Sequence, residues 1–261
     1  MSMPIFWISD KKIDAWSRKK NIFFILSIGR SGTQFLSALL NQSPQAYVVH
    51  EPVRKDFKAY IKAFHDETDA EKYIIRFRKK NIYARASKKN ISTYGEVNSV
   101  LRRHGPALKR SFPDAHIIHL IRDGRAMVRS AMSRLTMTER DPNTQGISPS
   151  TGDPWRDKWP HMSRFERICW YWDIENRYLN KHIERSIQFE KIVSSYDYFK
   201  NNLLGPLNLE INKDIWDTET RAPQNITKEH VFSHWTEWES KETEAFLRIC
   251  GETMMRNGYR I

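Results

Sequence analysis

The stretch Asn21–Leu40 reads NIFFILSIGRSGTQFLSALL, and it decides the fold. Its first part, Asn21–Ser27, is a short run of β-branched and aromatic residues that is typical of a buried strand. After Gly29 the apolar residues recur at helical spacing, at Phe35, Leu36, Leu39 and Leu40. We therefore predict a strand that passes through a tight loop into a helix.

The loop between this strand and this helix has the composition of a phosphate-binding loop. The first backbone N–H groups of a helix lack internal partners and the helix dipole is positive there, so an anion is attracted. Glycine lets the backbone approach an anion closely, and an arginine adds a permanent charge that can contact two oxygens. We expect the phosphate ligands to come from the loop residues Arg30, Ser31, Gly32, Thr33 and Gln34.

The same loop differs from a Walker A motif. Gly32 is followed by Thr33 and Gln34, where GxxxxGK[ST] has a lysine and a hydroxyl residue. This argues against a metal-dependent kinase or NTPase, and we expect no metal site. Taken alone, residues 30–33 also fit an ordinary turn in which a hydroxyl caps the helix.

A second anion site is expected after the apolar run Ile117–Ile121. Arg122 follows this predicted strand, and Ser130 lies eight residues later, about two turns along a helix. Both side chains can face the carboxyl edge of the sheet, where open α/β sheets bind ligands. We predict that Arg122 and Ser130 hold a second phosphate, whereas for Arg129 and Arg134 we favour a solvated basic helix face.

Strands and helices are predicted to alternate along the rest of the chain. Further strands are expected at 46–49, 115–121 and 186–189, and helices at 57–78, 123–135, 165–183, 195–204 and 227–259. This alternation favours an α/β fold with a mostly parallel sheet and helices on both faces. Residues 136–160 are polar and rich in Pro, Gly, Ser and Asp, which predicts a surface loop or lid. No repeat divides the chain, so residues 1–261 are expected to form one domain.

Composition limits the class of protein. The chain has two cysteines, Cys169 and Cys250, without metal-ligand spacing, which argues against a disulfide framework or structural zinc. The most apolar stretch, Ile22–Ile28, is too short to span a membrane, and Met1–Lys20 is charged, so we expect a cytoplasmic protein. The net charge of +12 predicts an anionic partner without choosing among nucleotide, acidic acceptor, nucleic acid and membrane surface.

Together the two anion-binding segments resemble the sulfotransferase family. Residues 30–34 look like its 5′-phosphosulfate loop, and the Arg122–Ser130 spacing looks like its 3′-phosphate motif. Residues 29–52 are most similar to carbohydrate and bacterial sulfotransferases, and Phe189 replaces a tyrosine that contacts adenine in some relatives. The resemblance implies a P-loop-type three-layer domain that moves a sulfuryl group from 3′-phosphoadenosine 5′-phosphosulfate (PAPS) to an acceptor hydroxyl, with sugars among the candidates. A third 3′-phosphate contact could come from Arg221 or Lys228.

The resemblance also implies a catalytic pair of groups. Arg30 would stabilise the leaving phosphate, whose charge increases as sulfuryl transfer proceeds. Glu51 is our first candidate for the general base, with a structural carboxylate as the alternative, and Glu96 is the second candidate. His50 is a weaker candidate, because in an extended segment its side chain would point opposite to that of Glu51.

Two other classes of function stay open at this point. A nucleic-acid or polyanion-binding protein would account for the positive charge, although no nucleic-acid-binding motif is present. A P-loop kinase is disfavoured by the missing lysine. Among the tryptophans, Trp155 and Trp159 lie in the polar loop and are candidates for acceptor contact, whereas core positions are predicted for Trp170, Trp172, Trp235 and Trp238.

Overall fold

A five-stranded parallel sheet forms the centre of the protein in the computed structural model, which describes residues 8–222 and 232–261. The strand order is β2-β3-β1-β4-β5, and every pair of neighbours is parallel. The strands are β1 (Asn21–Leu26), β2 (Ala46–His50), β3 (Thr93–Asn98), β4 (His116–Ile121) and β5 (Ser186–Gln188). This arrangement confirms the predicted α/β class with a parallel sheet.

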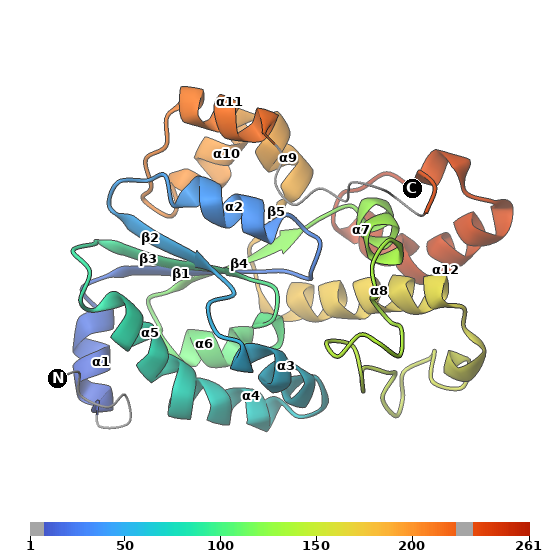
Figure 1. Ribbon diagram of the computed structural model, residues 1–261, viewed down its shortest axis with the longest axis horizontal. Coiled ribbons are helices and arrows are strands. Elements are labelled where there is room, and N and C mark those ends of the chain that lie inside the picture. Colours follow the sequence, from blue (N-terminus) through green and yellow to red (C-terminus); the bar gives the residue numbers. More distant parts are fainter. Residues whose placement is uncertain (1–7, 223–231) are drawn as a thin grey trace.

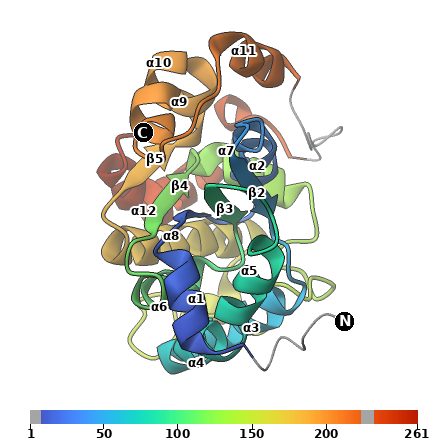
Figure 2. The ribbon, with the colours of Figure 1, turned by 90° about the vertical axis from the view of Figure 1, so that its left-hand side faces the viewer.

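Helices cover both faces of this sheet (Figures 1 and 2). One face carries α2 (Thr33–Leu40), α9 (Phe189–Ser194), α10 (Tyr196–Phe199) and α11 (Lys213–Arg221). The other carries α1 (Asp10–Ser17), α3 (Lys55–His65), α4 (Glu67–Tyr73), α5 (Lys79–Ala86) and α6 (Gly105–Ser111). Beyond the carboxyl ends of the strands lie α7 (Gly124–Met132), α8 (Arg164–His182) and α12 (Ser240–Arg256). None of the described helices has the length and apolar character needed to cross a membrane.

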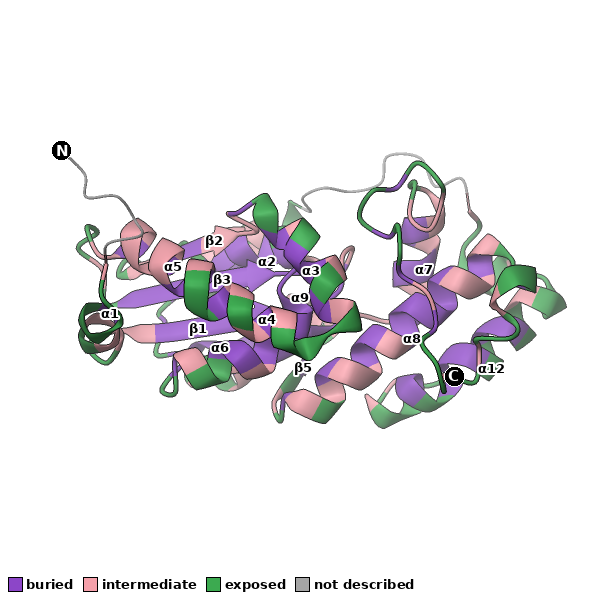
Figure 3. Cartoon of the chain, turned by 90° about the horizontal axis from the view of Figure 1, so that it is seen from below, coloured by how far each residue is buried: buried purple, intermediate pink, exposed green. Residues whose placement is uncertain are grey.

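The central strand β1 has no polar face because both of its sides are covered. Phe23 and Ile25 pack into the cluster beneath α2 and α9, whereas Phe24 and Leu26 pack into the cluster on the opposite face. Successive side chains of a strand point to opposite faces, so a strand in the middle of a three-layer domain must be apolar throughout. In Figure 3 the inner strands β1 and β3 are coloured mostly as buried, while α4 and α6 carry exposed residues.

The order of the strands brings four chain segments to one edge of the sheet. β1 pairs with β3 on one side and with β4 on the other. The strands β2 and β3 therefore lie on one side of β1, and β4 and β5 lie on the other. Ligands bind outside the carboxyl ends of the strands at such a switch point. The segments that follow β1, β2, β3 and β4 therefore meet there, and they contain Arg30, Glu51, Ser99 and Arg122.

Several elements differ from the predicted ones. The helix expected at 57–78 is interrupted at Asp66, whose side chain accepts a hydrogen bond from the Thr68 amide and starts α4, and a π-helical turn follows at Ile74–Arg78. Strand β3 and the helices α1, α5, α6, α9 and α11 were not predicted. In the tail, the described part contains a 3₁₀ turn at Trp235–Glu237 and then α12, while residues 227–231 lie outside the described residues. Residues 136–158 contain turns and no helix or strand.

Candidate active site

The phosphate-binding loop turns sharply at Gly32, which precedes the first residue of α2. Gly32 has φ +81°, in the left-handed region that favours glycine. A Cβ atom at this position would lie 2.1 Å from Cε2 of Phe189. Phe189, at the start of α9, therefore packs against the loop backbone and excludes every residue but glycine. The predicted strand, loop and helix are all present.

Arg30 and Arg122 line the same cleft, which has a volume of about 650 Å³. Nη1 of Arg122 donates a hydrogen bond to the carbonyl oxygen of Arg30 at 2.8 Å, and Nε of Arg30 donates to Oγ of Ser130 at 2.9 Å. The two segments predicted to bind anions are thus in direct contact. Gly32, Thr33 and Gln34 line the cleft as well, whereas Ser31 is fully buried and is not part of its lining.

Buried polar atoms without partners point to an anionic ligand. Within the described residues, Nε of Arg122 and Oγ of Ser31 are buried and have no hydrogen-bond partner. Nearly all buried polar groups in folded proteins are hydrogen-bonded, so such exceptions need an explanation. Burial, then the charges of Arg134 and Arg122, lower the pKa of Arg30. An anion in the cleft would satisfy the Arg122 donor and relieve this repulsion, so the residues fit a phosphate-bearing ligand.

Glu51 and His50 face this cleft together. Glu51 directly follows strand β2 and has φ +40°, and its Oε1 accepts hydrogen bonds from the Ser99 hydroxyl and, at 3.3 Å, from the Ser99 amide. Nε2 of His50 lies 3.6 Å from Oε1 of Glu51 and 3.0 Å from Oγ1 of Thr33. The predicted opposite orientation of His50 and Glu51 is wrong, because the backbone leaves the extended conformation at Glu51.

The environment of His50 keeps its ring uncharged. Burial lowers the pKa of His50, and the nearby Glu51 charge only partly opposes this effect. At pH 7 the imidazole is therefore neutral. A neutral His50 can hydrogen-bond Thr33 without neutralising the Glu51 carboxylate.

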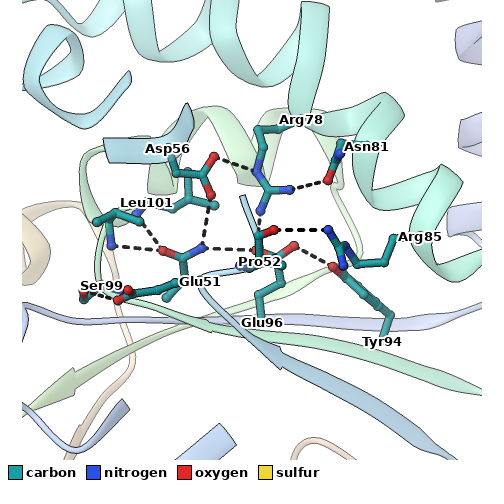
Figure 4. A network of polar contacts seen from close by, with 12 residues as sticks. Glu51, Pro52, Asp56, Arg78, Asn81, Arg85, Tyr94, Glu96, Ser99 and Leu101 are labelled. Atoms are coloured by element: carbon teal, nitrogen blue, oxygen red, sulfur yellow. Dashed lines mark hydrogen bonds and ion pairs between the residues drawn. The ribbon is translucent and has the colours of Figure 1, made fainter. Parts of the chain in front are cut away.

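Glu96 lies outside the cleft, in a buried network of polar side chains (Figure 4). Arg78 contacts Glu96 through Nη2 and Asp56 through Nε at 3.1 Å, and all three side chains are 0% exposed. Tyr94 donates a hydrogen bond to Oε1 of Glu96 at 2.6 Å. Asn98 connects this network to the loop after β3: its Nδ2 donates to Oε2 of Glu96 at 3.3 Å, and its Oδ1 accepts from the amides of residues 100 and 101, just after Ser99.

Other cleft residues escaped the sequence analysis. Trp235 was predicted to be a core residue, but it is 43% exposed and lines the cleft with the Arg125 guanidinium 4.5 Å from its ring centre. Arg129 also lines the cleft, and its Nε donates to the Phe232 carbonyl at 3.2 Å, which corrects the prediction of a solvated position. Nothing in the spacing of residues along the sequence distinguishes Trp235 and Arg129 from residues that lie outside the cleft. Ser99 could have been found as the polar residue after a strand, had β3 been predicted.

The remaining sequence candidates lie elsewhere. Trp155 and Trp159 are not part of the cleft lining, and Trp159 packs against Trp170 at a ring distance of 4.9 Å. Arg221 is exposed at the end of α11, although its neighbour Thr220 lines the cleft. Lys228 falls outside the described residues. Trp170 and Trp172 are fully buried, as predicted.

The parallel sheet, the glycine turn before α2 and the paired anion-binding segments define a P-loop-type α/β domain. A family model described as "Sulfotransferase family" matches residues 23–210, which is most of the chain. This protein therefore belongs to the sulfotransferase family, as the sequence motifs predicted, and it is a sulfuryl transferase. The family assignment removes the support for a kinase or a nucleic-acid-binding protein.

One solved structure shares this fold, and a second was found at a lower similarity. A crystal structure of a sulfotransferase from Alicyclobacillus acidocaldarius is similar with a TM-score of 0.52 and 16% identity, covering 93% of this chain and 97% of that one. A crystal structure of mouse sulfotransferase SULT7A1 complexed with PAP has a TM-score of 0.48 and 14% identity, covering 92% and 85% of the two chains. A search of curated protein sequences gave no significant match.

Proposed function

We propose that this protein transfers a sulfuryl group from PAPS to the hydroxyl of an acceptor, with a carbohydrate as one candidate. The observation that carries the proposal is the meeting of Arg30 and Arg122 in one cleft, joined by a 2.8 Å hydrogen bond, with Glu51 on the cleft wall. PAPS carries a phosphosulfate and a separate 3′-phosphate. Two linked cationic segments match two linked anionic groups.

The donor nucleotide is held by the chain at both of its anionic ends. The amides of the loop and Arg30, Thr33 and Gln34 bind the phosphosulfate, with Ser31 beneath the loop. Arg122 and Ser130 bind the 3′-phosphate, for which Nε of Arg122 is available. The Ser130 hydroxyl already accepts from Arg30, so its own hydrogen can be donated to the nucleotide.

The catalytic step requires one charge to be stabilised and one proton to be removed. Arg30 faces the leaving phosphate, where a preorganised donor contributes about 10²- to 10³-fold in rate. Glu51 takes the proton of the acceptor hydroxyl, while the Ser99 hydroxyl and amide hold its carboxylate in one orientation. Neutral His50 leaves the charge of Glu51 intact. In-line transfer depends on this positioning of donor, base and acceptor.

Nucleotide binding is the first test. Calorimetry with PAP, the bisphosphate product, should show tight binding without metal, whereas AMP, which lacks the 3′-phosphate, should bind weakly. Arg122→Ala should weaken PAP binding about 10- to 100-fold, the value of a charge-assisted hydrogen bond, with little effect on AMP. Arg76→Ala, at an exposed position away from the cleft, is the matched control. Equal affinities for PAP and AMP would contradict the proposal.

A further inference from the structure

A second cavity of about 720 Å³ opens beside the cleft. The two cavities share Gly29, Arg30 and Ser99 as lining residues. Ser99 is also the residue that holds the Glu51 carboxylate. The second cavity thus begins at the proposed reaction centre and extends along α3, α7 and the segment 133–144.

Positive charge exceeds negative charge around this second cavity. Four arginines line it, Arg30, Arg102, Arg134 and Arg140, against one acid, Asp141. Arg102 is buried and forms an ion pair with Glu175, 3.0 Å away, which it shares with Arg103. The Asp141 carboxylate accepts hydrogen bonds within its own loop, from the Thr144 hydroxyl at 2.7 Å and the Asn143 amide at 3.0 Å.

Arg134 and Arg140 are the cations left for a ligand. Both are exposed, and within the described residues neither guanidinium forms an ion pair or a hydrogen bond. Arg134 lines only the second cavity, whereas Arg122 lines only the first. The two arginines thus line different cavities, and the charge of each acts on Arg30, which lines both.

Between Arg30 and these cations the wall of the second cavity is largely apolar. Leu135 is 56% exposed, an unusual position for a large apolar side chain in a wall that faces water. The apolar lining residues are Phe57, Val100, Met127, Ala131, Met132 and Leu135. A ligand that fits this cavity has an apolar surface and a negative charge.

We propose that the second cavity is the acceptor subsite and that it selects an acceptor carrying an oxyanion, a carboxylate or a sulfate, besides the hydroxyl that is sulfated. Arg134 and Arg140 bind the oxyanion, the apolar wall contacts the body of the acceptor, and the hydroxyl lies toward Glu51. This inference rests on the proposed function. It adds the charge of the acceptor, which the family assignment does not give.

The test compares small charged probes with neutral probes of the same shape, in a sugar series and in a phenol series, which are the two scaffolds. The sugar set is methyl glucuronide, sulfated methyl glucoside and neutral methyl glucoside, which separates carboxylate from sulfate. The phenol pair is para-hydroxyphenylacetate and its neutral amide. Binding is measured by ligand-observed NMR, with and without PAP, on the wild-type protein, the double variant Arg134→Gln/Arg140→Gln and the control Arg76→Gln.

We expect the anionic probe to bind roughly tenfold more tightly than its neutral partner in at least one scaffold, as for hydrogen bonds to charged groups. This preference should vanish in the double variant, persist in Arg76→Gln and shrink at high salt. Equal binding in both scaffolds, absence of any probe binding, or a preference that survives in the double variant would overturn the inference. Failure to bind PAP while the anionic preference persists would instead overturn the proposed function, and the second cavity would then be an anion-binding site without the role of an acceptor subsite.

Discussion

The cleft and the buried network around Arg78 contain the same kinds of charged side chain, but in the network they stabilise the fold and in the cleft they are placed to bind a ligand. In the network, Arg78 contacts the carboxylates of Asp56 and Glu96, and water reaches none of the three. In the cleft, Arg122 keeps a buried N–H without a partner in the described part of the chain, and Arg30 lies among other cations. Buried ion pairs hold a structure in place, whereas a buried N–H group without a partner leaves a hydrogen bond for a ligand to complete.

Glu96 and Glu51 show how the position of a glutamate in the sheet decides whether it is buried in an ion pair or lines the cleft. Glu96 lies inside strand β3, where its side chain is covered by α3 and the turn that contains Arg78. Glu51 comes directly after β2, the strand next to β3, where the chain turns and the carboxylate lines the cleft. A glutamate at a strand end can therefore contact substrate, while one within a covered strand cannot.

The largest effect is expected for Glu51→Gln. This change removes the proposed base but keeps the size of the side chain, so kcat should fall by about 10²- to 10⁴-fold with PAP affinity and stability retained. Steady-state rates with a sulfated-product assay and calorimetry with PAP measure the two quantities. Glu96→Gln is the counterpart, and it should lower stability while the folded fraction keeps its activity. If Glu96→Gln abolished turnover in a fully folded protein and Glu51→Gln did not, the roles would be reversed.

Arg78→Met tests the network side of the comparison. Removing Arg78 leaves two buried carboxylates without a cation, so the free energy of unfolding should fall by about 3–5 kcal/mol. Urea unfolding followed by tryptophan fluorescence gives this value. Arg122→Ala serves as the control, because a cation in the open cleft should contribute far less to stability. A network that stabilised nothing would leave the two variants alike.

The smallest effect concerns pH. Burial raises the pKa of Asp56 to about 6, with Arg78 opposing and Glu96 adding to the shift. The folded state therefore binds this proton more tightly than the unfolded state, so the contribution of Asp56 is present below about pH 4 and is lost as the pH rises through 6. Relative to wild type, Asp56→Asn should gain on the order of 1–3 kcal/mol between these pH values.

Urea midpoints measured across the same pH range test this prediction. Burial also raises the pKa of Asp173 to about 6, so the wild-type curve contains both groups and only the difference between wild type and Asp56→Asn isolates one. A difference that stays constant with pH would show that Asp56 keeps its ordinary pKa in the folded protein.

The sequence predicted those parts of the molecule in which local pattern and tertiary packing agree. The β1–α2 unit and the Arg122–Ser130 segment were found because their periodicity and loop residues are local signals. Strand β3 was missed because Gly95 and Asn98 are poor strand formers. Gly95 is required there by packing, since a Cβ would lie 2.0 Å from Cζ of Phe23 on β1. Such a requirement comes from a distant residue and leaves no pattern in the sequence.

The candidate site was predicted only where the chain is regular. The alternation rule for strands gave the wrong orientation of His50 and Glu51, because it assumes an extended backbone through residue 51. Trp235 is a large aromatic residue of a kind usually found in a core. It lines the cleft only because of how the tail of the chain packs. The second cavity depends on the segment 133–144, whose turns are not fixed by periodicity.

The positive φ of Glu51 has a consequence for engineering this protein. A residue other than glycine in such a conformation destabilises the folded state by about 1 kcal/mol, so glycine at position 51 would remove this backbone strain. A library screened for heat resistance alone should accumulate glycine there, and if Glu51 is the base, as proposed, the selected variants would lose turnover. Thermostable descendants of this chain should therefore be selected on turnover and melting temperature together.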